Sequence, residues 1–194
     1  MAKIGLDNFR YGQLTEDAEG EATYGVAKKP GKAINCNVSI TSNDAKLFAD
    51  NGLAESDTSF QSGTVTLGID DDDLQTQADL LGHTYSEEDG LVRNANDAAP
   101  YVGVGRIITK VVNGVYKYKV EFLRKVKFSE PSQEDNTRGE SVEFGTTEIE
   151  GTVSTLANGK WSDAKVFTTK QEAITYLESL FGTATAGAGT QNNG

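Results

Sequence analysis

Alternation of apolar and polar residues is strongest between Tyr101 and Phe128, on both sides of Asn113-Gly114. Asn-Gly is a preferred pair for a two-residue β-hairpin turn, so this stretch predicts two antiparallel strands. Alternation in the second strand runs over about fourteen residues, against ~5 to 6 for an ordinary strand. The hairpin is therefore predicted to be longer than a compact core needs and to be completed from outside the subunit. Its apolar face, interrupted by Arg124, is predicted to hold Tyr116, Tyr118, Val120, Phe122, Val126 and Phe128.

Further strands are predicted by the same period of two. Ala33 to Thr41 alternates well and is followed by Ser42-Asn43-Asp44, which predicts a turn. A strand rich in Glu and Thr ends near Val153, and its parity slips near Gly145, where we expect a β-bulge. Ser86 to Pro100 has no period and is predicted to be a loop. The remaining strand candidates are Lys3 to Leu14, Lys46 to Ala49, Gly63 to Ile69 and Ala164 to Phe167.

Two helices are predicted by spacing and by their end signals. Four aspartates, Asp70 to Asp73, precede an apolar pattern that stops at Gly82, which suits a short helix with acidic residues at its N-terminus. Thr169 to Glu172 matches a capping box, and apolar residues at helical spacing follow it up to Gly182. This second helix should lay its apolar stripe over a sheet.

The fold class predicted from these elements is mainly β with one or two helices (α+β). The chain of 194 residues is predicted to form a single domain over residues 1–182. Residues 183–194 contain no charge and nothing apolar larger than alanine, so we expect a disordered tail in the free subunit.

Composition narrows the class of protein. Hydrophobic content of 37 % with 21 glycines and three prolines suits a turn-rich β protein, and no apolar run reaches the ~18 to 20 residues of a membrane span. The N-terminus lacks the pattern of a secretory signal, so we expect synthesis in a cytoplasm and no membrane partner. Cys36 is the single cysteine and His83 the single histidine, which excludes an internal disulfide and a structural zinc site within one chain.

Charge is distributed unevenly. Between Arg106 and Lys127 there are seven basic residues and one acidic residue, so this segment carries +6 and the rest of the chain −17 of the net −11. The basic hairpin could meet an acidic surface of another subunit or bind nucleic acid. It could also be a solvated strand face that discourages aggregation at a sheet edge.

Catalytic and metal-binding motifs are weak throughout. The run Asp70 to Asp73 lacks the ligand spacing of an EF-hand, and Glu148 with Glu150 is better explained as a solvated strand face than as a glycosidase pair. No nucleophile motif surrounds His83, and neither Gly103-Val104-Gly105 nor the glycine-rich tail completes a nucleotide-binding fingerprint. Trp161 follows a turn signal and is expected to pack rather than bind sugar. We therefore expect no enzyme, no metal and no cofactor.

Several segments in order resemble the major tail (tail tube) proteins of long, non-contractile-tailed bacteriophages (siphophages) of Gram-positive bacteria. The segments are Lys3-Ile-Gly-Leu-Asp-Asn-Phe-Arg-Tyr11, Lys46-Leu-Phe-Ala-Asp-Asn51 and the run from Lys125 to Thr152. This resemblance implies a tail-tube-type β-sandwich or barrel with a flanking C-terminal helix and long hairpin and loop extensions. It also implies a structural virion protein that polymerises as stacked hexameric rings around a tape measure protein, between initiator (distal tail) and terminator proteins. Double-stranded DNA would pass through the lumen without specific binding, and assembly would occur in the host cytoplasm.

The candidate site residues are those that ring assembly would use. The loop 129–139 is predicted to contact an adjacent ring through Ser129, Glu130, Pro131, Glu134, Asp135, Arg138 and Gly139. Four lysines of the hairpin are predicted to form one basic face paired with neighbouring subunits: Lys117, Lys119, Lys125 and Lys127. The alternative from another class is a monomeric β-sandwich module that recognises carbohydrate or protein at a cell or virion surface.

Overall fold

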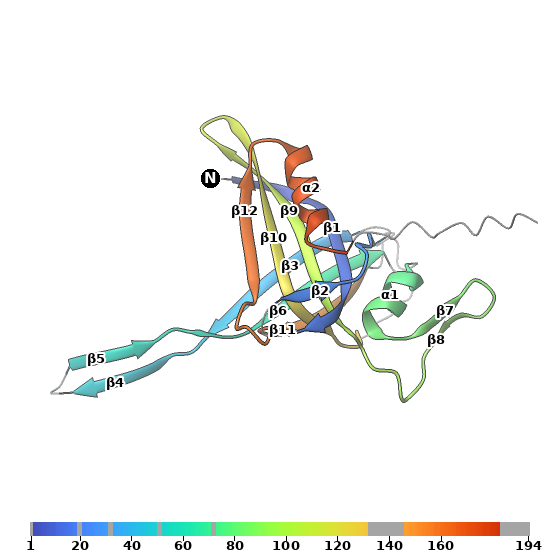
Figure 1. Ribbon diagram of the computed structural model, residues 1–194, viewed down its shortest axis with the longest axis horizontal. Coiled ribbons are helices and arrows are strands. Elements are labelled where there is room, and N and C mark those ends of the chain that lie inside the picture. Colours follow the sequence, from blue (N-terminus) through green and yellow to red (C-terminus); the bar gives the residue numbers. More distant parts are fainter. Residues whose placement is uncertain are drawn as a thin grey trace, which may run out of the picture.

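The computed structural model describes residues 2–18, 21–30, 33–49, 52–70, 73–131 and 146–182. The predicted mainly β fold with two helices is confirmed (Figure 1). In chain order the elements are β1 (Ala2–Asp17), β2 (Ala22–Tyr24), β3 (Ala33–Ser42), β4 (Ala45–Ala49), β5 (Gly52–Asp57), β6 (Phe60–Asp70), α1 (Leu74–Leu81), β7 (Thr84–Ser86), β8 (Gly90–Val92), β9 (Tyr101–Val112), β10 (Val115–Phe128), β11 (Thr146–Val153), β12 (Ser162–Phe167) and α2 (Lys170–Ser179).

One antiparallel sheet organises the molecule. Its strand order is β2-β1-β9-β10-β11-β6-β3, and β12 pairs with β10 beside this path. β12 occupies Tyr118 to Leu123 of β10, whereas β11 pairs with the last three residues, Val126 to Phe128. The sheet therefore divides along β10 into an upper part with β12 and a lower part with β11, as Figure 1 shows.

The predicted long hairpin is confirmed as β9 and β10. Asn113 and Gly114 at its turn have φ of 51° and 78°, the left-handed conformation that a type I′ turn requires at both positions. Val115 and Tyr116 next to the turn are each 56 % exposed, so the hairpin extends past the core as its length predicted.

The prediction of a single apolar face along β10 is wrong, because a β-bulge interrupts the strand. Leu123 pairs with Val104 and Val126 with Val102, so β10 contains one residue more than β9 over this interval. An extra residue reverses the alternation, and it places Leu123 and Val126 on one face and Phe122 on the other. Arg124, the apparent interruption of the sequence pattern, marks this bulge.

The two faces of β10 contribute to two hydrophobic clusters. The first lies between the upper and lower parts of the sheet, with α1 against it and Trp161 stacked on Phe60 at 4.5 Å between ring centroids. The predicted packing role of Trp161 is thus confirmed. The first cluster consists of Phe9, Tyr11, Cys36, Val65, Leu67, Ile69, Leu80, Leu81, Val102, Val104, Leu123, Val126, Phe128, Ile149 and Val153.

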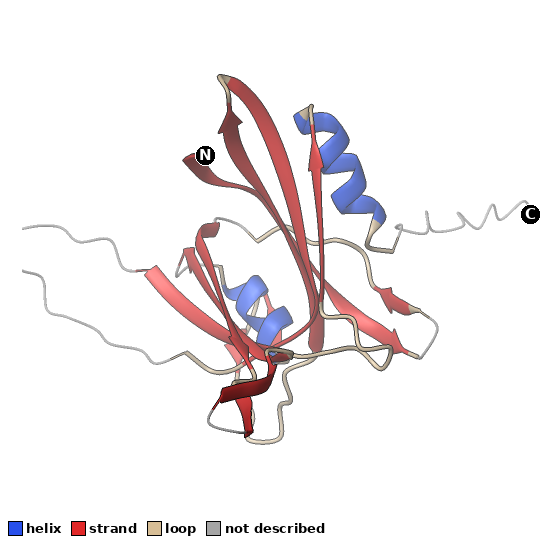
Figure 2. Cartoon of the chain, turned by 90° about the vertical axis from the view of Figure 1, so that its left-hand side faces the viewer, coloured by secondary structure: helices blue, strands red, loops and turns tan. Residues whose placement is uncertain are grey.

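The second cluster lies under α2, on the opposite face of the upper sheet (Figure 2). Phe122 is 1 % exposed, and it meets Tyr24 and Phe181 edge to face at 5.2 Å in each case. Gly103 and Gly105 of β9 leave space for the Phe122 ring, since a Cβ at either position would lie within 3.2 Å of that ring. The predicted position of the C-terminal helix over a sheet face is confirmed.

Both helices begin at the predicted signals and α1 ends at the predicted glycine, whereas α2 ends at Ser179, before the predicted stop at Gly182. The Asp73 carboxylate accepts a hydrogen bond from Thr76 N at 3.2 Å, and Gly82 ends α1 with a φ of 79°. Thr169 accepts a hydrogen bond from Glu172 N at 3.3 Å at the start of α2.

Two hairpins project from this body and were not predicted. The prediction that the chain turns back after Ser42 is wrong, because the chain continues into β4. β4 pairs with β5 to form an arm that extends away from the sheet (Figure 1). The predicted loop from Ser86 to Pro100 contains β8, which pairs with β7. The predicted strand Lys46 to Ala49 is confirmed as part of β4, but its pairing with β5 was not predicted. β7 and β8 have three residues each, and a period-two search detects strands of that length poorly.

Some predictions fall outside the described residues. They are the bulge near Gly145, the loop positions after Pro131 and the tail 183–194.

Candidate functional site

The upper part of the sheet has two open edges. Its four strands follow the order β12-β10-β9-β1, and every neighbouring pair is antiparallel. β2 and a bridge at Lys28 occupy the outer edge of β1 from Tyr11 onward, while Ala2 to Arg10 have no strand partner there among the described residues. The outer edge of β12 likewise has no strand partner in the part of the chain that the structure describes. Open edges of this kind are templates for pairing with another chain.

The directions of the edge strands matter for such pairing. Because each step across the four strands reverses direction, β12 runs antiparallel to β1 of its own chain. A second copy turned about an axis parallel to the strands would present its β1 antiparallel to the first copy's β12. The edges of this sheet are therefore compatible with head-to-tail pairing between copies.

An ionic cluster lies on the face of the upper sheet opposite α2. Glu121 Oε2 accepts hydrogen bonds from Arg106 Nε at 3.0 Å and Nη2 at 2.7 Å, and Glu121 Oε1 accepts one from Lys119. Arg106 also donates to the main-chain oxygen of Cys36 in β3, which ties this edge strand to the upper sheet. Burial opposes the charged form of Glu121, but the hydrogen bonds from Lys119 and Arg106 outweigh it and lower the pKa of this carboxyl group.

The Glu121→Gln variant should lower the free energy of unfolding by roughly 1–3 kcal/mol at about pH 7, because Arg106 and Lys119 lose their charged partner. A lowered folded-state pKa contributes stability above the unfolded value of about 4.3, and this contribution is lost as the pH falls through the folded-state value. The difference between wild type and variant should thus shrink at about pH 3. Urea unfolding at both pH values measures it, with the exposed Glu88→Gln as the control. An equal difference at both pH values would contradict this account.

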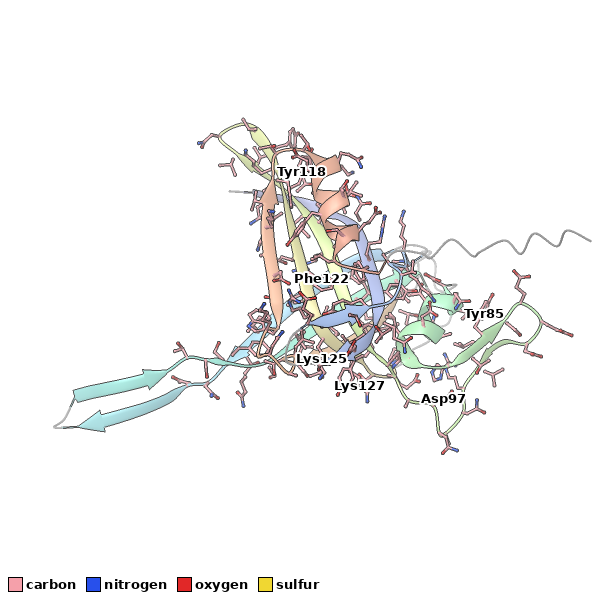
Figure 3. All side chains as sticks on the ribbon, viewed as in Figure 1. Tyr85, Asp97, Tyr118, Phe122, Lys125 and Lys127 are labelled. Atoms are coloured by element: carbon pink, nitrogen blue, oxygen red, sulfur yellow. The ribbon has the colours of Figure 1, made fainter. Side chains whose placement is uncertain are left out.

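The four hairpin lysines do not form one face, which corrects the prediction. Lys117 and Lys119 share the face of Glu121, whereas the bulge places Lys125 and Lys127, both labelled in Figure 3, on the opposite side. There both ammonium groups lie over the Tyr101 ring. Lys119 binds Glu121, and Lys125 binds Asp17 at 2.6 Å, so these two lysines have partners in their own chain. Lys117 and Lys127 have no ion pair with a described residue.

The start of the predicted loop is attached to the body. Ser129 donates from its backbone N to Glu150 O at 2.9 Å, and Glu130 lies against His83. A cavity of about 330 Å³ lies beside this attachment and is lined by Ser129, Glu130, Pro131, Glu148 and Glu150. Glu148 and Glu150 are both exposed, as expected for a solvated strand face. The other predicted contact residues, Glu134, Asp135, Arg138 and Gly139, lie outside the described residues.

Sequence reasoning missed the open edges and the ionic cluster. The edges depend on which distant strands become neighbours, and no local pattern encodes that choice. The cluster had a usable signal, since Glu121 is the single acidic residue between Arg106 and Lys127.

Within the described residues, no helix has the length and apolar character needed to cross a bilayer. No group of three or more acidic, histidine or cysteine side chains is placed to hold a metal ion in these ranges. Comparison with models of known protein families and with curated proteins gives no match.

Proposed function

We propose that this chain is the subunit of a siphophage tail tube, a major tail protein that assembles into stacked rings. The observation that supports the proposal best is the four-stranded upper sheet with two open, mutually antiparallel edges. The number of six copies per ring comes from the resemblance of the sequence to that family.

Ring formation would remove both edges at once. If β12 of each copy pairs with β1 of the next, the antiparallel alternation continues from copy to copy, and the sheets join into one closed barrel. A closed barrel leaves no edge for uncontrolled aggregation. A sheet with one open edge could form only pairs, so the presence of two is the property that a ring needs.

The extensions supply contacts between rings in this proposal. The β4–β5 arm projects beyond the sheet that would form the barrel, so it can reach another copy (Figure 1). The segment that begins at Ser129 leaves the body at the lower end of β10. We propose that it contacts an adjacent ring, as was already expected from the sequence.

The charge distribution is compatible with a conduit for DNA. Phosphate contacts by lysine or arginine add salt-sensitive affinity, which a conduit must avoid. Four of the seven basic residues between Arg106 and Lys127 have an ion pair within the chain: Arg106 and Lys119 with Glu121, Arg124 with Asp163, and Lys125 with Asp17. Asp163 and Asp17 come from outside this segment, so the pairs lower its charge excess from +6 to +4 within the subunit.

The proposal carries a set of partners. They are further copies of the chain, a tape measure protein within the tube, and initiator (distal tail) and terminator proteins at its ends, with double-stranded DNA passing through. The protein would reside in the virion after assembly in the host cytoplasm, without a cofactor.

Negative-stain microscopy of the concentrated purified protein tests the proposal, and tubes with a central channel are expected. A second test covers the case in which polymerisation needs an initiator. Cysteines at Gly5 in β1 and Lys165 in β12 should cross-link head to tail under oxidation and give a ladder of covalent multimers. A Cβ at Gly5 meets nothing within 4 Å, and burial raises the pKa of the Cys36 thiol, which keeps it out of the reaction.

The matched control pairs Gly5→Cys with Val92→Cys, at an exposed position of β8 outside the main sheet. It should give no ladder above background. Absence of both tubes and a ladder specific to Gly5 and Lys165 would overturn the proposal and favour a monomeric binding module.

A further inference from the structure

His83 is buried at a junction of three segments. It follows Gly82 at the end of α1, and its side chain is only 4 % exposed. Gly82 is held in the left-handed conformation, and a Cβ there would lie 2.2 Å from Ala98 O, so the segment 94–98 packs closely on this end of the helix. The third segment is the chain that leaves β10 at Ser129.

Both ring nitrogens of His83 face carboxylates. Nδ1 lies 2.8 Å from Asp97 Oδ2, and Nε2 lies 2.5 Å from Glu130 Oε1. The second contact has ion-pair distance but not the angle of a regular hydrogen bond, so Nε2 is buried without a regular hydrogen-bond partner. Among the described residues these two carboxylates are the charged groups in ion-pair contact with the ring; Asp97 comes from the connection before β9 (Figure 3).

Asp97 is ionised in this arrangement. Its carboxylate accepts a hydrogen bond from Asn94 N at 2.8 Å, and this bond, followed by the one from His83, lowers the pKa of Asp97. Asp97 therefore holds one ring nitrogen as a donor over the whole neutral range.

Whether the contact between Nε2 and Glu130 is attractive depends on how many protons the ring carries. A neutral imidazole carries one N–H, and the other nitrogen has a lone pair. If Asp97 takes the N–H of Nδ1, a neutral ring directs the lone pair of Nε2 at the Glu130 carboxylate, and the two repel. The contact with Glu130 is attractive only when a further proton is held between Nε2 and Oε1.

We propose that His83 is a proton-operated clamp on the segment that follows β10. With the ring protonated, Glu130 is held against the end of α1; with the ring neutral, Glu130 is released while Asp97 stays bound. The Glu130 side chain is 56 % exposed, so water is available to replace the lost contact. Release therefore accompanies a rise in pH, and it acts where the chain enters the predicted ring-contact loop.

NMR spectroscopy of the isotopically labelled full chain in dilute solution tests the clamp. His83 is the single histidine, so one set of ring signals reports its titration. In the wild type, the backbone amide signal of Glu130 should shift in parallel with the ring signals, with the same midpoint. In His83→Gln, whose amide does not titrate, that shift of the Glu130 signal should be lost. The Glu88→Gln control, at an exposed position in the turn between β7 and β8, should keep the pH-dependent shift of the Glu130 signal.

A second variant separates the clamp from general loosening of this region. In Glu130→Gln the ring should still titrate, and the amide signal of Asp97 should still follow it. A Glu130 signal that ignores the ring titration in the wild type, or one that shifts equally in His83→Gln, would overturn the clamp. The measurement is independent of the proposed tube, because it requires no assembly.

Discussion

Replacing Phe122 with alanine should lower the free energy of unfolding by about 3–5 kcal/mol. The side chain is 1 % exposed and is the largest fully buried one among the described residues, and its ring contacts Tyr24 and Phe181 edge to face. Alanine would leave a cavity that the surrounding helix and strands cannot fill, because Gly103 and Gly105 offer no side chain to collapse into it. Urea unfolding followed by the fluorescence of Trp161, the single tryptophan, measures the loss.

Tyr116→Ala provides the matched control. It removes an aromatic ring from the same strand, but at a position that is 56 % exposed, so the change should stay within about 0.5 kcal/mol. Similar losses in both variants would show that the cluster under α2 is not a principal source of stability.

Introducing a carboxylate at Val166 should abolish tube formation and leave the subunit folded. Val166 lies on β12 and is 57 % exposed, so Val166→Asp should change the free energy of unfolding of the isolated subunit by no more than about 0.5 kcal/mol. In a ring, the same aspartate would be moved from water into every junction between copies, at a cost of several kcal/mol each. Its cross-strand neighbour Lys119 is already bound to Glu121 and would offset this cost only in part. Sedimentation and negative-stain microscopy, under conditions in which the wild type polymerises, measure the loss.

Val92→Asp is the control for this variant. Val92 is an exposed valine of β8, which belongs to a separate two-stranded sheet. Tubes should form normally with this substitution. Normal tubes with Val166→Asp would show that β12 does not lie at a junction, and the ring geometry proposed above would then be wrong.

Local signals in the sequence predicted the elements where the physical cause is local. Asn113-Gly114 predicted the hairpin because both residues tolerate a positive φ, and Thr169 predicted the start of α2 because its hydroxyl can accept a backbone hydrogen bond. The long alternation of β10 correctly indicated a hairpin that extends past the core.

Apart from the two projecting hairpins, the features that were not predicted depend on pairing between distant segments. β12 and β11, which come from two different later parts of the chain, pair with successive stretches of the same edge of β10. No local sequence pattern indicates that two strands share this edge. The contact between His83 and Glu130 joins residues far apart in sequence for the same reason. Arg124 was the available clue to the bulge. A charged residue in an otherwise apolar series can indicate that the series changes from one face of the strand to the other at that point.

The bulge in β10 also sets a rule for sequence divergence. Loss of one residue between Leu123 and Val126 would restore strict alternation with Val126 still opposite Val102, so Leu123, Val126 and Phe128 would all keep facing the first cluster. A single deletion at this point would therefore keep these core side chains on their own face and would remove only the local bend that the bulge gives β10. Loss of the bulge at unchanged length, by contrast, would turn Val126 and Phe128 outward, so homologous chains with a regular strand here should lack one residue of this interval.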